Sequence, residues 1–442
     1  MRKSKDFNVS FLLTGLAIVV IASGLARFAL MGGGISSHKV NLTFWNGFTG
    51  PDGIVMLHII EEFNKENPDV AVQMQRIPWG TYYNKLTVAG MDDRAPAVFV
   101  VHADQLPRLR RAGFIGPANS AFEGPRGIDP TDFDPYLLDR VKFAGAFAGV
   151  PLDIHPQGMY CNSDMLRAAG LVDSQGQPHA PKDRTEFIFA LEKLSSSSSP
   201  SENDKQWGFA LTAWDSNMRT LMPQFDGKYL DASGNSILNC PQNVEALNFL
   251  VMLCKQKKVP PPSNGLGWFG FRQKKVAIVW DGIFMLGDLK RVNTFQYVGA
   301  PIPTIGKHPG TLANSHVLCI RKGLSPRDLE ASIRFIRYLS NHGLEWAEAG
   351  QVPARRSLRK TSQFMAMQVQ HAFAEQIPWM MYPPKTPVLP EILFIMGQAV
   401  EHAVRQTSTA QKALDDANKS AQEVIDRDRR EHPEETILRK AA

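Results

Sequence analysis

The amino-acid sequence predicts an α/β fold, built as two domains or as one domain with two lobes. The chain has 442 residues, more than one ordinary hydrophobic core accommodates. From residue 41 onward, its apolar residues recur first at the spacing of strands and then at that of helices. Its 43% hydrophobic and 21% charged residues are typical of a globular protein.

The first half begins with alternating strand and helix patterns. Residues 41–45 are expected to form a strand, and a turn rich in glycine leads to a helix whose apolar positions lie within 56–63. Residues 70–74 alternate as a strand with one buried face, a second helix covers 82–86, and residues 98–101 form a short buried strand. This β-α-β-α-β order predicts a largely parallel sheet.

Later elements are marked mainly by helix caps. Asp183 and Ser325 each precede a helix, residues 159–161 read as a strand before the first of these helices, and residues 275–280 read as a strand between the two. The last helix is expected to begin near Ser408, again with a capping box. Its charged end, residues 426–435, is expected to be solvated or frayed.

Charge is concentrated at the start of the chain. The formal net charge is +6, but the residues before Val40 include five cationic side chains and only one acidic one, Asp6. The remainder therefore has a charge of only +2 with mixed signs. Because phosphate binding needs clustered cations, nucleic acid is not an expected partner.

The N-terminus is expected to be an export signal. Residues 1–5 are positive, and residues 11–26 form an uncharged apolar run of signal-peptide length. Two outcomes stay open: cleavage, or retention of residues 11–31 as a membrane anchor followed by a tether up to residue 39. In both, the body lies outside the membrane and touches it only through this segment.

Cysteine and histidine give no sign of a metal or cofactor. The cysteines form no CxxC pair. Cys240 and Cys254 are near enough in sequence for one disulfide; the alternative is that Cys161, Cys319 and these two are all small buried thiols. The histidines are scattered, so no metal cluster is expected.

Known catalytic and nucleotide-binding motifs are absent. Gly265–Gly270 fits G-x-G-x-x-G, but no strand precedes it and Trp268 and Phe269 occupy the place where a helix should open. A loop bearing aromatic residues is the simpler interpretation. The sequence has no G-x-x-x-x-G-K-[ST], H-E-x-x-H or G-x-S-x-G. The protein is therefore expected not to be an enzyme and to need no cofactor.

Aromatic residues in turns and at element ends are candidates for ligand contact. A sugar ring has an apolar C–H face and a hydroxyl rim, so its binder needs flat aromatic platforms beside polar groups. For any single aromatic, packing in the core is the alternative. The candidates are Trp45, Trp79, Tyr82, Tyr83, Trp214, Trp268, Phe284, Trp379 and Tyr382.

Two polar pairs are further candidates. His102 and Asp104 directly follow the strand at 98–101, where an open α/β sheet places its ligand crevice. Alternation puts Asp153 and His155 on one face of an extended segment. An acid–base pair is conceivable at the second position, but no nucleophile accompanies it, and contacts to a ligand at a domain crossover need fewer assumptions.

Seven segments of the sequence form an ordered set: NLTFWNGFTGPDG (41–53), EEFNKENPDVAVQ (61–73), PAVFVVHADQLPRL (96–109), GVPLDIHPQGMYCNSDMLRAAGL (149–171), VAIVWDGIF (276–284), VGAPIPTIGK (298–307) and WAEAGQVPARRS (346–357). Their most specific parts are the G-V-P…N-x-D-x-L…A-G-L pattern at 149–171 and A-G-x-V-P-A-R at 349–355. Together the segments resemble the extracellular sugar-binding proteins of ABC importers, the maltose-binding-protein-like family. The resemblance covers roughly residues 40–425.

The resemblance implies positions for the ligand contacts. The family's acidic hinge-strand ligand falls near His155, which departs from the pattern, and its stacking aromatic falls on Phe284 beside Asp281. The family's turn after the first strand corresponds to Thr49 and Asp52, and its polar pair in lobe one corresponds to His102 and Asp104. The loop of lobe two corresponds to Gln351 and Arg355, and the C-terminal aromatic wall corresponds to Trp379 and Tyr382.

The implied fold is a two-lobed periplasmic-binding-protein fold of type II, with a ligand cleft between lobes joined by hinge crossovers. Lobe 1 would comprise 40–152 and 294–345, and lobe 2 would comprise 153–293 and 346–442. Closure on the ligand would be hinge bending between two states.

The implied function is the exported, monomeric binding component of an ABC importer. It would capture a mono- or oligosaccharide and deliver it to separate permease subunits. Alternatives are a secreted or membrane-anchored carbohydrate-active hydrolase using carboxylates such as Asp153 and Asp281, a binder of glycerol-phosphate or polyols, and a membrane-tethered sensor.

Overall fold

The computed structural model describes residues 39–195, 205–211, 213–256, 259 and 266–433. The expected apolar leader, residues 11–31, lies outside the described residues. Within the described part, no helix is long and apolar enough to cross a membrane. All four cysteines are free, so the Cys240–Cys254 disulfide is absent from this structure.

The first sheet has five strands in the order β2-β1-β3-β12-β6. β1 runs parallel to β2 and β3, as predicted, and β12 returns antiparallel to β3 and β6. The strands are β1 (Val40–Asn46), β2 (Val70–Arg76), β3 (Val98–His102), β6 (Val150–Pro151) and β12 (His316–Ile320). The helices whose residues join this half are α2 (Asp52–Glu66), α3 (Trp79–Met91), α4 (Leu106–Arg111), α5 (Pro135–Val141), α12 (Pro326–Asn341) and α13 (Gly343–Glu348).

The second sheet is organised around β7 (Asp153–Asn162), whose ten residues are all buried. Its order is β14-β11-β7-β9-β8, with β10 and β13 also paired to β7. These strands are β8 (Trp207–Ala210), β9 (Val276–Gly282), β10 (Tyr297–Ala300), β11 (Thr311–Asn314), β13 (Val352–Pro353) and β14 (Met380–Met381). A separate hairpin joins β4 (Lys142–Phe143) and β5 (Ala146–Phe147).

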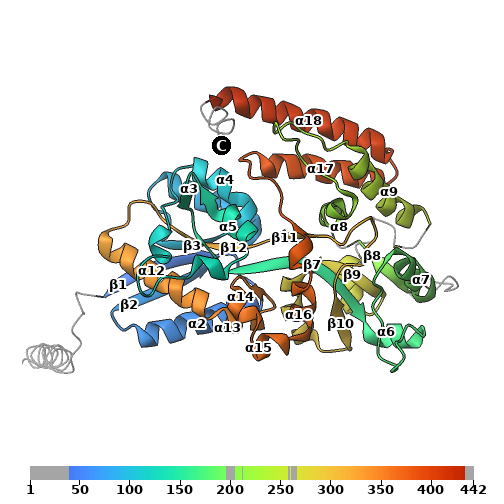
Figure 1. Cartoon of the computed structure of the whole chain (residues 1–442), viewed down its shortest axis with the longest axis horizontal. Helices are drawn as coiled ribbons and strands as arrows, with labels where there is room; N and C mark the ends of the chain where they lie inside the picture. The colour runs from blue at the N-terminus through green and yellow to red at the C-terminus, as the bar shows by residue number, and fades with distance from the viewer. Residues whose placement is uncertain (1–38, 196–204, 212, 257–258, 260–265, 434–442) are drawn as a thin grey trace, which may run out of the picture.

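The remaining helices follow or cover the second sheet. Figure 1 shows α17 and α18 side by side above it, with β7 crossing the middle of the molecule. These helices are α6 (Ser163–Ala168), α7 (Arg184–Leu194), α8 (Trp214–Leu221), α9 (Pro241–Lys255), α10 (Gly267–Arg272), α11 (Leu286–Val292), α14 (Arg356–Arg359), α15 (Ser362–Met365), α16 (Gln368–Ala374), α17 (Leu389–Val404) and α18 (Ala410–Glu431).

Local caps explain where several helices begin. The side chains of Asp183 and Ser325 accept hydrogen bonds from the backbone N–H three residues on, which confirms both predicted caps. The expected cap of the last helix was wrong by one residue, because Thr409 rather than Ser408 accepts the bond from the Lys412 N–H. Its charged end is not frayed through 431, and Asp428 is buried there.

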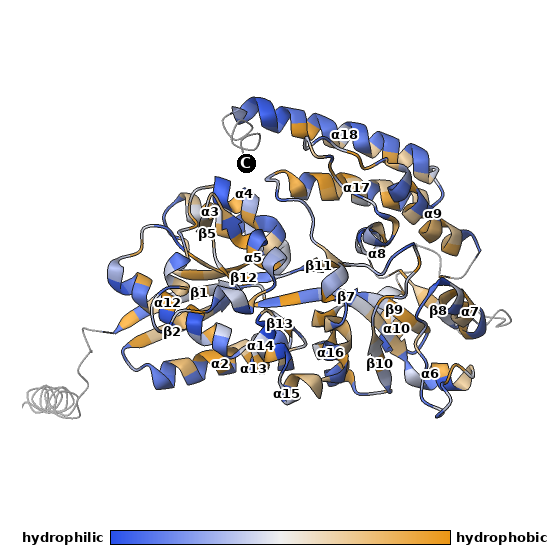
Figure 2. Cartoon of the chain, viewed as in Figure 1, coloured by the Kyte–Doolittle hydropathy of each residue, from blue (hydrophilic) through white to orange (hydrophobic). Residues whose placement is uncertain are grey.

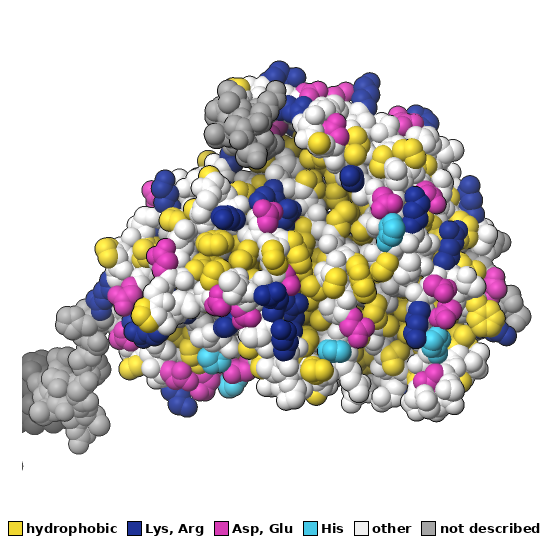
Figure 3. Space-filling view, in the orientation of Figure 1, with side chains coloured by type: hydrophobic (Ala, Val, Ile, Leu, Met, Phe, Trp, Pro, Cys, Tyr) yellow, Lys and Arg dark blue, Asp and Glu magenta, His cyan; other side chains and the backbone are white. Residues whose placement is uncertain are grey.

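The core lies against both faces of the two sheets. Apolar side chains of the strands are almost all buried, and Figure 2 shows hydrophobic strands inside and hydrophilic outer turns on α2 and α18. The largest fully buried side chains include Trp280 in the second half and Trp346 in the first. In Figure 3, apolar side chains also gather along the middle of the visible face, between the two halves.

The chain passes between the halves at three places, which together form what we call the interlobe seam: 151–153, 314–316 and 349–352. Each passage joins a strand or helix of the first half either to β7 itself or to a strand paired with β7. Of the stretch 294–345, β10 and β11 pair with β7, while β12 lies in the first sheet. The lobe limits given by the sequence remain a prediction.

Candidate functional site

Three histidines from three strands meet at the interlobe seam. His316 on β12 lies directly opposite His102 at the end of β3, so the antiparallel register puts both side chains on one face. His155, near the start of β7, completes the group, with ring centroids 4.3 Å from His316 and 5.5 Å from His102. These three histidines are scattered in the sequence but lie together in the structure, so the expectation of no histidine cluster is wrong.

Asp153 is the hydrogen-bonding centre beneath these rings. Its carboxylate accepts bonds from the backbone N–H of His316 at 2.9 Å, from His316 Nδ1 at 2.8 Å and from Trp346 Nε1 at 2.7 Å. His155 Nε2 lies 3.4 Å from Oδ1. Burial raises the pKa of Asp153, opposed by His155 and these hydrogen bonds. Asp153, which is fully buried, therefore links β7 to β12 and α13 at the seam.

The three imidazoles are neutral at pH 7. Burial lowers the pKa of His102 to about 4 and that of His316 to about 3. Burial also lowers the pKa of His155 well below its usual value. The Tyr83 hydroxyl bonds His102 Nδ1, just as Asp153 engages His316 Nδ1, so in both rings the second nitrogen is left for another partner.

Aromatic side chains enclose the histidines. The Trp79 ring stacks on His316 with centroids 5.7 Å apart and an interplanar angle of 11°. Phe284 packs edge-on to His155 at 6.4 Å, yet its side chain stays 47% exposed. Of the predicted aromatics, Trp79 and Phe284 thus lie at the seam, and Phe284 offers a free apolar face.

A carboxylate just after β3 and a guanidinium on α8, those of Asp104 and Arg219, interact electrostatically. Asp104, in the turn after β3, has a buried Oδ1 with no hydrogen-bond partner among the described residues. Arg219 on α8 is 8% exposed. Burial acts to lower the pKa of Arg219, but Tyr229 and the charge of Asp104 outweigh it and raise that pKa. The two charges therefore interact without a direct hydrogen bond.

A hollow of about 390 Å³ opens between α8 and α17 beside Arg219. That volume is in the usual range of small-molecule sites. Its lining combines aromatic and charged groups: Trp214, Asp215, Arg219, Leu393, Phe394, Gly397, Gln398 and Glu401. Arg405 lies over the Trp214 ring, 4.8 Å from its centroid, so one face of this indole is already occupied.

Buried amides nearby also lack partners. Both amide atoms of Gln351 and of Asn217 are buried without a hydrogen bond among the described residues. Gln351 immediately precedes β13, whose Val352 pairs with Ile154, so it lies beside His155 in the sheet. An unpaired buried amide is costly unless something else binds it, so these groups are candidate ligand contacts.

Other predicted residues are engaged in the fold. The Tyr82 hydroxyl donates to the carbonyls of Trp45 and Val100 inside the core. Lys85 covers the Trp45 ring, and Trp268 Nε1 donates to Asp288. These contacts match the alternative that such aromatics fill or cover core.

Four further predicted residues have mainly local or seam contacts. Asp52 accepts bonds from the N–H groups of Gly50 and Gly53, and Thr49 beside this turn is exposed. Asp281, in β9, accepts from the Gly282 N–H, and the Tyr382 hydroxyl bonds Ser315 at 2.7 Å. Tyr382 therefore reaches the seam, whereas Asp52 fixes a backbone turn.

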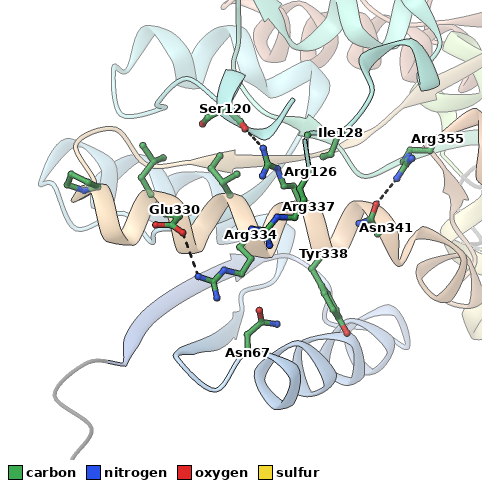
Figure 4. A pocket seen from close by; sticks show the side chains of 14 residues that line it. Asn67, Ser120, Arg126, Ile128, Glu330, Arg334, Arg337, Tyr338, Asn341 and Arg355 are labelled. Carbon is green, nitrogen blue, oxygen red and sulfur yellow. Dashed lines mark hydrogen bonds and ion pairs between the residues drawn. The ribbon is translucent and has the colours of Figure 1, made fainter. Parts of the chain in front are cut away.

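Two predicted residues lie in hollows away from the histidines. Trp379 is 46% exposed and lines a surface hollow of about 690 Å³ with Lys228. Arg355 donates to Asp132 and Asn341 at the rim of a hollow of about 940 Å³ along α12. Figure 4 shows this second hollow, where Arg334 pairs with Glu330 and Arg337 donates to the carbonyl of Ser120.

Sequence reasoning missed His316, Trp346, Arg219 and Asn217. His316 and Trp346 belong to no recognisable motif and come to Asp153 only through contacts across more than 160 residues of sequence. Arg219 and Asn217 are on a short helix after β8, and the only available signal was their position after a strand.

The two sheets, the three crossings and the seam between them define a two-lobed periplasmic-binding-protein fold. Solved structures with this fold include an ABC substrate-binding protein from Listeria monocytogenes in complex with cycloalternan (TM-score 0.76, 19% identity, covering 88% of this chain and 99% of that one). A second is the maltotriose-binding protein of Thermus thermophilus (TM-score 0.72, 18% identity, 87% and 100% covered).

The bacterial extracellular solute-binding protein family matches residues 58–370, and the chain belongs to this family. Among characterised relatives, the arabinooligosaccharide-binding protein of Bacillus subtilis is 21% identical over 272 residues. That match spans 59% of this chain and 58% of the relative's length. A putative ABC transporter periplasmic-binding protein of Escherichia coli is 21% identical, with 73% and 74% covered.

Proposed function

We propose that this protein binds a mono- or oligosaccharide at the interlobe seam and delivers it to an ABC importer without transforming it. The observation that carries the proposal is the buried, unpartnered Oδ1 of Asp104, whose charge acts on the buried Arg219. A carboxylate and a guanidinium that interact in this way would offer acceptors and donors to the hydroxyl rim of one sugar.

The apolar requirements of a sugar are also met nearby. Phe284 exposes a ring face beside His155, and Trp214 lines the hollow that contains Arg219. Such faces suit the C–H side of a pyranose. The names of relatives point the same way, since they bind arabino-oligosaccharide, cycloalternan and maltotriose.

The geometry does not favour the hydrolase alternative. Asp153 is fully buried and accepts three hydrogen bonds, while Asp281 in β9 accepts a hydrogen bond from the Gly282 N–H. A glycosidase needs two carboxylates free to face one glycosidic bond. We further propose that the protein acts outside the cytoplasm as a monomer and that residues 11–31 either anchor it or are removed on export.

The proposal is tested by presenting a panel of saccharides to the full-length protein. We expect at least one saccharide to quench tryptophan fluorescence and to raise the melting temperature, because a ligand that binds only the folded state stabilises it. Glycerol-phosphate and simple polyols belong in the same panel. A response to those compounds alone would mean that the ligand is a polyol or a glycerol-phosphate and not a sugar. A response to no compound in the panel would reject the proposal.

A further inference from the structure

The three seam histidines have a geometry that sugar binding does not require. One ring nitrogen from each of His102, His155 and His316 lies within 4.8 Å of the other two. A tetrahedral zinc with Zn–N bonds of about 2.1 Å places its nitrogens about 3.4 Å apart. The rings therefore need to approach by no more than about 1.4 Å, which side-chain rotation can supply.

The partners of these rings are those of a metal site. Asp153 Oδ2 engages His316 Nδ1 at 2.8 Å, and the Tyr83 hydroxyl engages His102 Nδ1. Metal-binding histidines usually donate their second nitrogen to a carboxylate or another oxygen, which fixes ring orientation and tautomer. Both rings are held in this way, with Nε2 left for a ligand.

The third histidine supplies an independent sign of a missing partner. His155 is 6% exposed, and its Nε2 is buried without a hydrogen bond among the described residues. Its nearest acceptor, Asp153 Oδ1, is 3.4 Å away. Because an unsatisfied buried nitrogen costs free energy, a group that binds it would stabilise the folded state.

The charges around the rings favour a cation. Asp153 is in contact with them, and Asp104 acts electrostatically on His102. Three imidazole nitrogens form the protein part of many zinc sites that keep a fourth position open, and the same donors suit other divalent transition metals. His102 is the least buried of the three, so its side is the route by which an ion or a fourth ligand enters.

We propose that His102, His155 and His316 bind one divalent transition-metal ion, with Zn²⁺ the best match, at the base of the interlobe seam. Asp153 and Tyr83 orient the ligands. The ligands of this ion are different residues from Asp104 and Arg219 of the proposed saccharide site, and an open coordination position would lie close to a bound sugar.

The test uses the full-length chain without a histidine tag, stripped with EDTA and titrated with Zn²⁺ by calorimetry. We expect one ion per chain and a higher melting temperature with Zn²⁺. His102→Gln and His155→Gln should each abolish one-to-one binding or weaken it at least tenfold, and Asp153→Asn should weaken it roughly 10- to 100-fold. His308→Gln, at an exposed histidine on another surface, should bind as wild type does.

Substitution of Co²⁺ supplies a second readout. A nitrogen-rich site of low coordination number should give a visible absorption band that is lost in His102→Gln, the least buried and therefore the least disruptive change. Melting curves in EDTA establish that each variant is folded. The proposal is overturned if wild type shows no saturable binding, or if binding survives in both histidine variants. Saccharide binding is also measured in EDTA, so that a failure of the metal proposal can be distinguished from a failure of the proposed saccharide function.

Discussion

At the scale of single residues, Asp104 is the clearest candidate for direct ligand contact. Its Oδ1 is buried without a partner, and its charge acts on Arg219. Asp104→Asn keeps the shape but removes the charge, so we expect saccharide affinity to fall about 10- to 100-fold, corresponding to roughly 1.5–3 kcal/mol for a charged hydrogen bond. Titration calorimetry measures the affinity, and an unchanged dissociation constant would remove Asp104 from the site.

Phe284 tests the apolar part of the same site. Because half of its side chain is exposed, Phe284→Ala should cost little folding stability but should weaken saccharide binding roughly 3- to 10-fold through the lost ring face. Chemical denaturation and a binding titration are run on the same preparation. Phe269→Ala is a matched control, since that ring is 60% exposed on α10. Equal losses of stability and binding at Phe284 would indicate a core role.

The residue scale also shows where sequence reasoning reaches its limit. His102, Asp104 and His155 were predicted because they follow or begin buried strands. Their partners His316 and Trp346 could not be, because no local pattern encodes the register between β3 and β12 or the bond from α13 to Asp153. For Trp268 the structure adds a contact that the sequence did not reveal, since its indole N–H donates to Asp288.

At the scale of elements, the start of α18 separates two adjacent candidates. Thr409 caps the helix, whereas Ser408 Oγ is buried without a partner among the described residues. Thr409→Ala should therefore lower the free energy of unfolding by about 1 kcal/mol, and Ser408→Ala should change it little. Urea denaturation compares the two variants. A larger loss of unfolding free energy for Ser408→Ala would indicate that Ser408, the residue predicted from the sequence, caps the helix.

The loop that contains Asp132 shows how one carboxylate fastens two elements. Burial acts to raise the pKa of Asp132, but hydrogen bonds from Ser357 and Arg355 outweigh it, so the pKa lies below its usual value. Because the folded-state pKa is the lower one, this contact stabilises the fold above the unfolded pKa of about 4 and is lost as pH falls through the folded pKa.

Asp132→Asn should therefore be less stable than wild type at pH 7. The difference should shrink as pH is lowered from about 4 through the folded pKa, because wild-type Asp132 then becomes protonated. Urea denaturation at a series of pH values measures it. A difference that stays constant over this range would show that the charge of Asp132 does not contribute.

Elements were predicted better than their assembly. The first three strands and the two helices between them follow from local periodicity, and the caps at Asp183 and Ser325 follow from single side chains. The assignment of β10 and β11 to β7 depends on long-range pairing, which periodicity does not carry. The same holds for Asp428, whose charged surroundings in the sequence predicted a solvated or frayed helix end.

At the scale of the whole molecule, the ion pair between α4 and α18 is among the contacts that join the two halves. Asp428 at the end of α18 binds Arg111 on α4, and only 9% of Asp428 is exposed. If this pair stabilises the closed arrangement of the lobes, Asp428→Asn lowers the closed population and with it the apparent saccharide affinity, by severalfold.

The variant Asp416→Asn is the matched control for Asp428→Asn. Asp416 pairs with Lys412 on the exposed face of the same helix, where such pairs contribute little. Small-angle X-ray scattering should show a larger radius of gyration for Asp428→Asn than for the control. Identical radii and affinities would show that this pair does not affect the arrangement of the lobes.

The central claim is that the seam between the lobes captures a saccharide through Asp104 and Arg219. Its most direct test is calorimetric titration of the best saccharide from the panel into the wild-type protein and into the double variant Asp104→Asn, Arg219→Gln. We predict one saturable site in the wild type and at least a hundredfold weaker binding in the folded double variant. Equal affinity in both proteins would contradict this account.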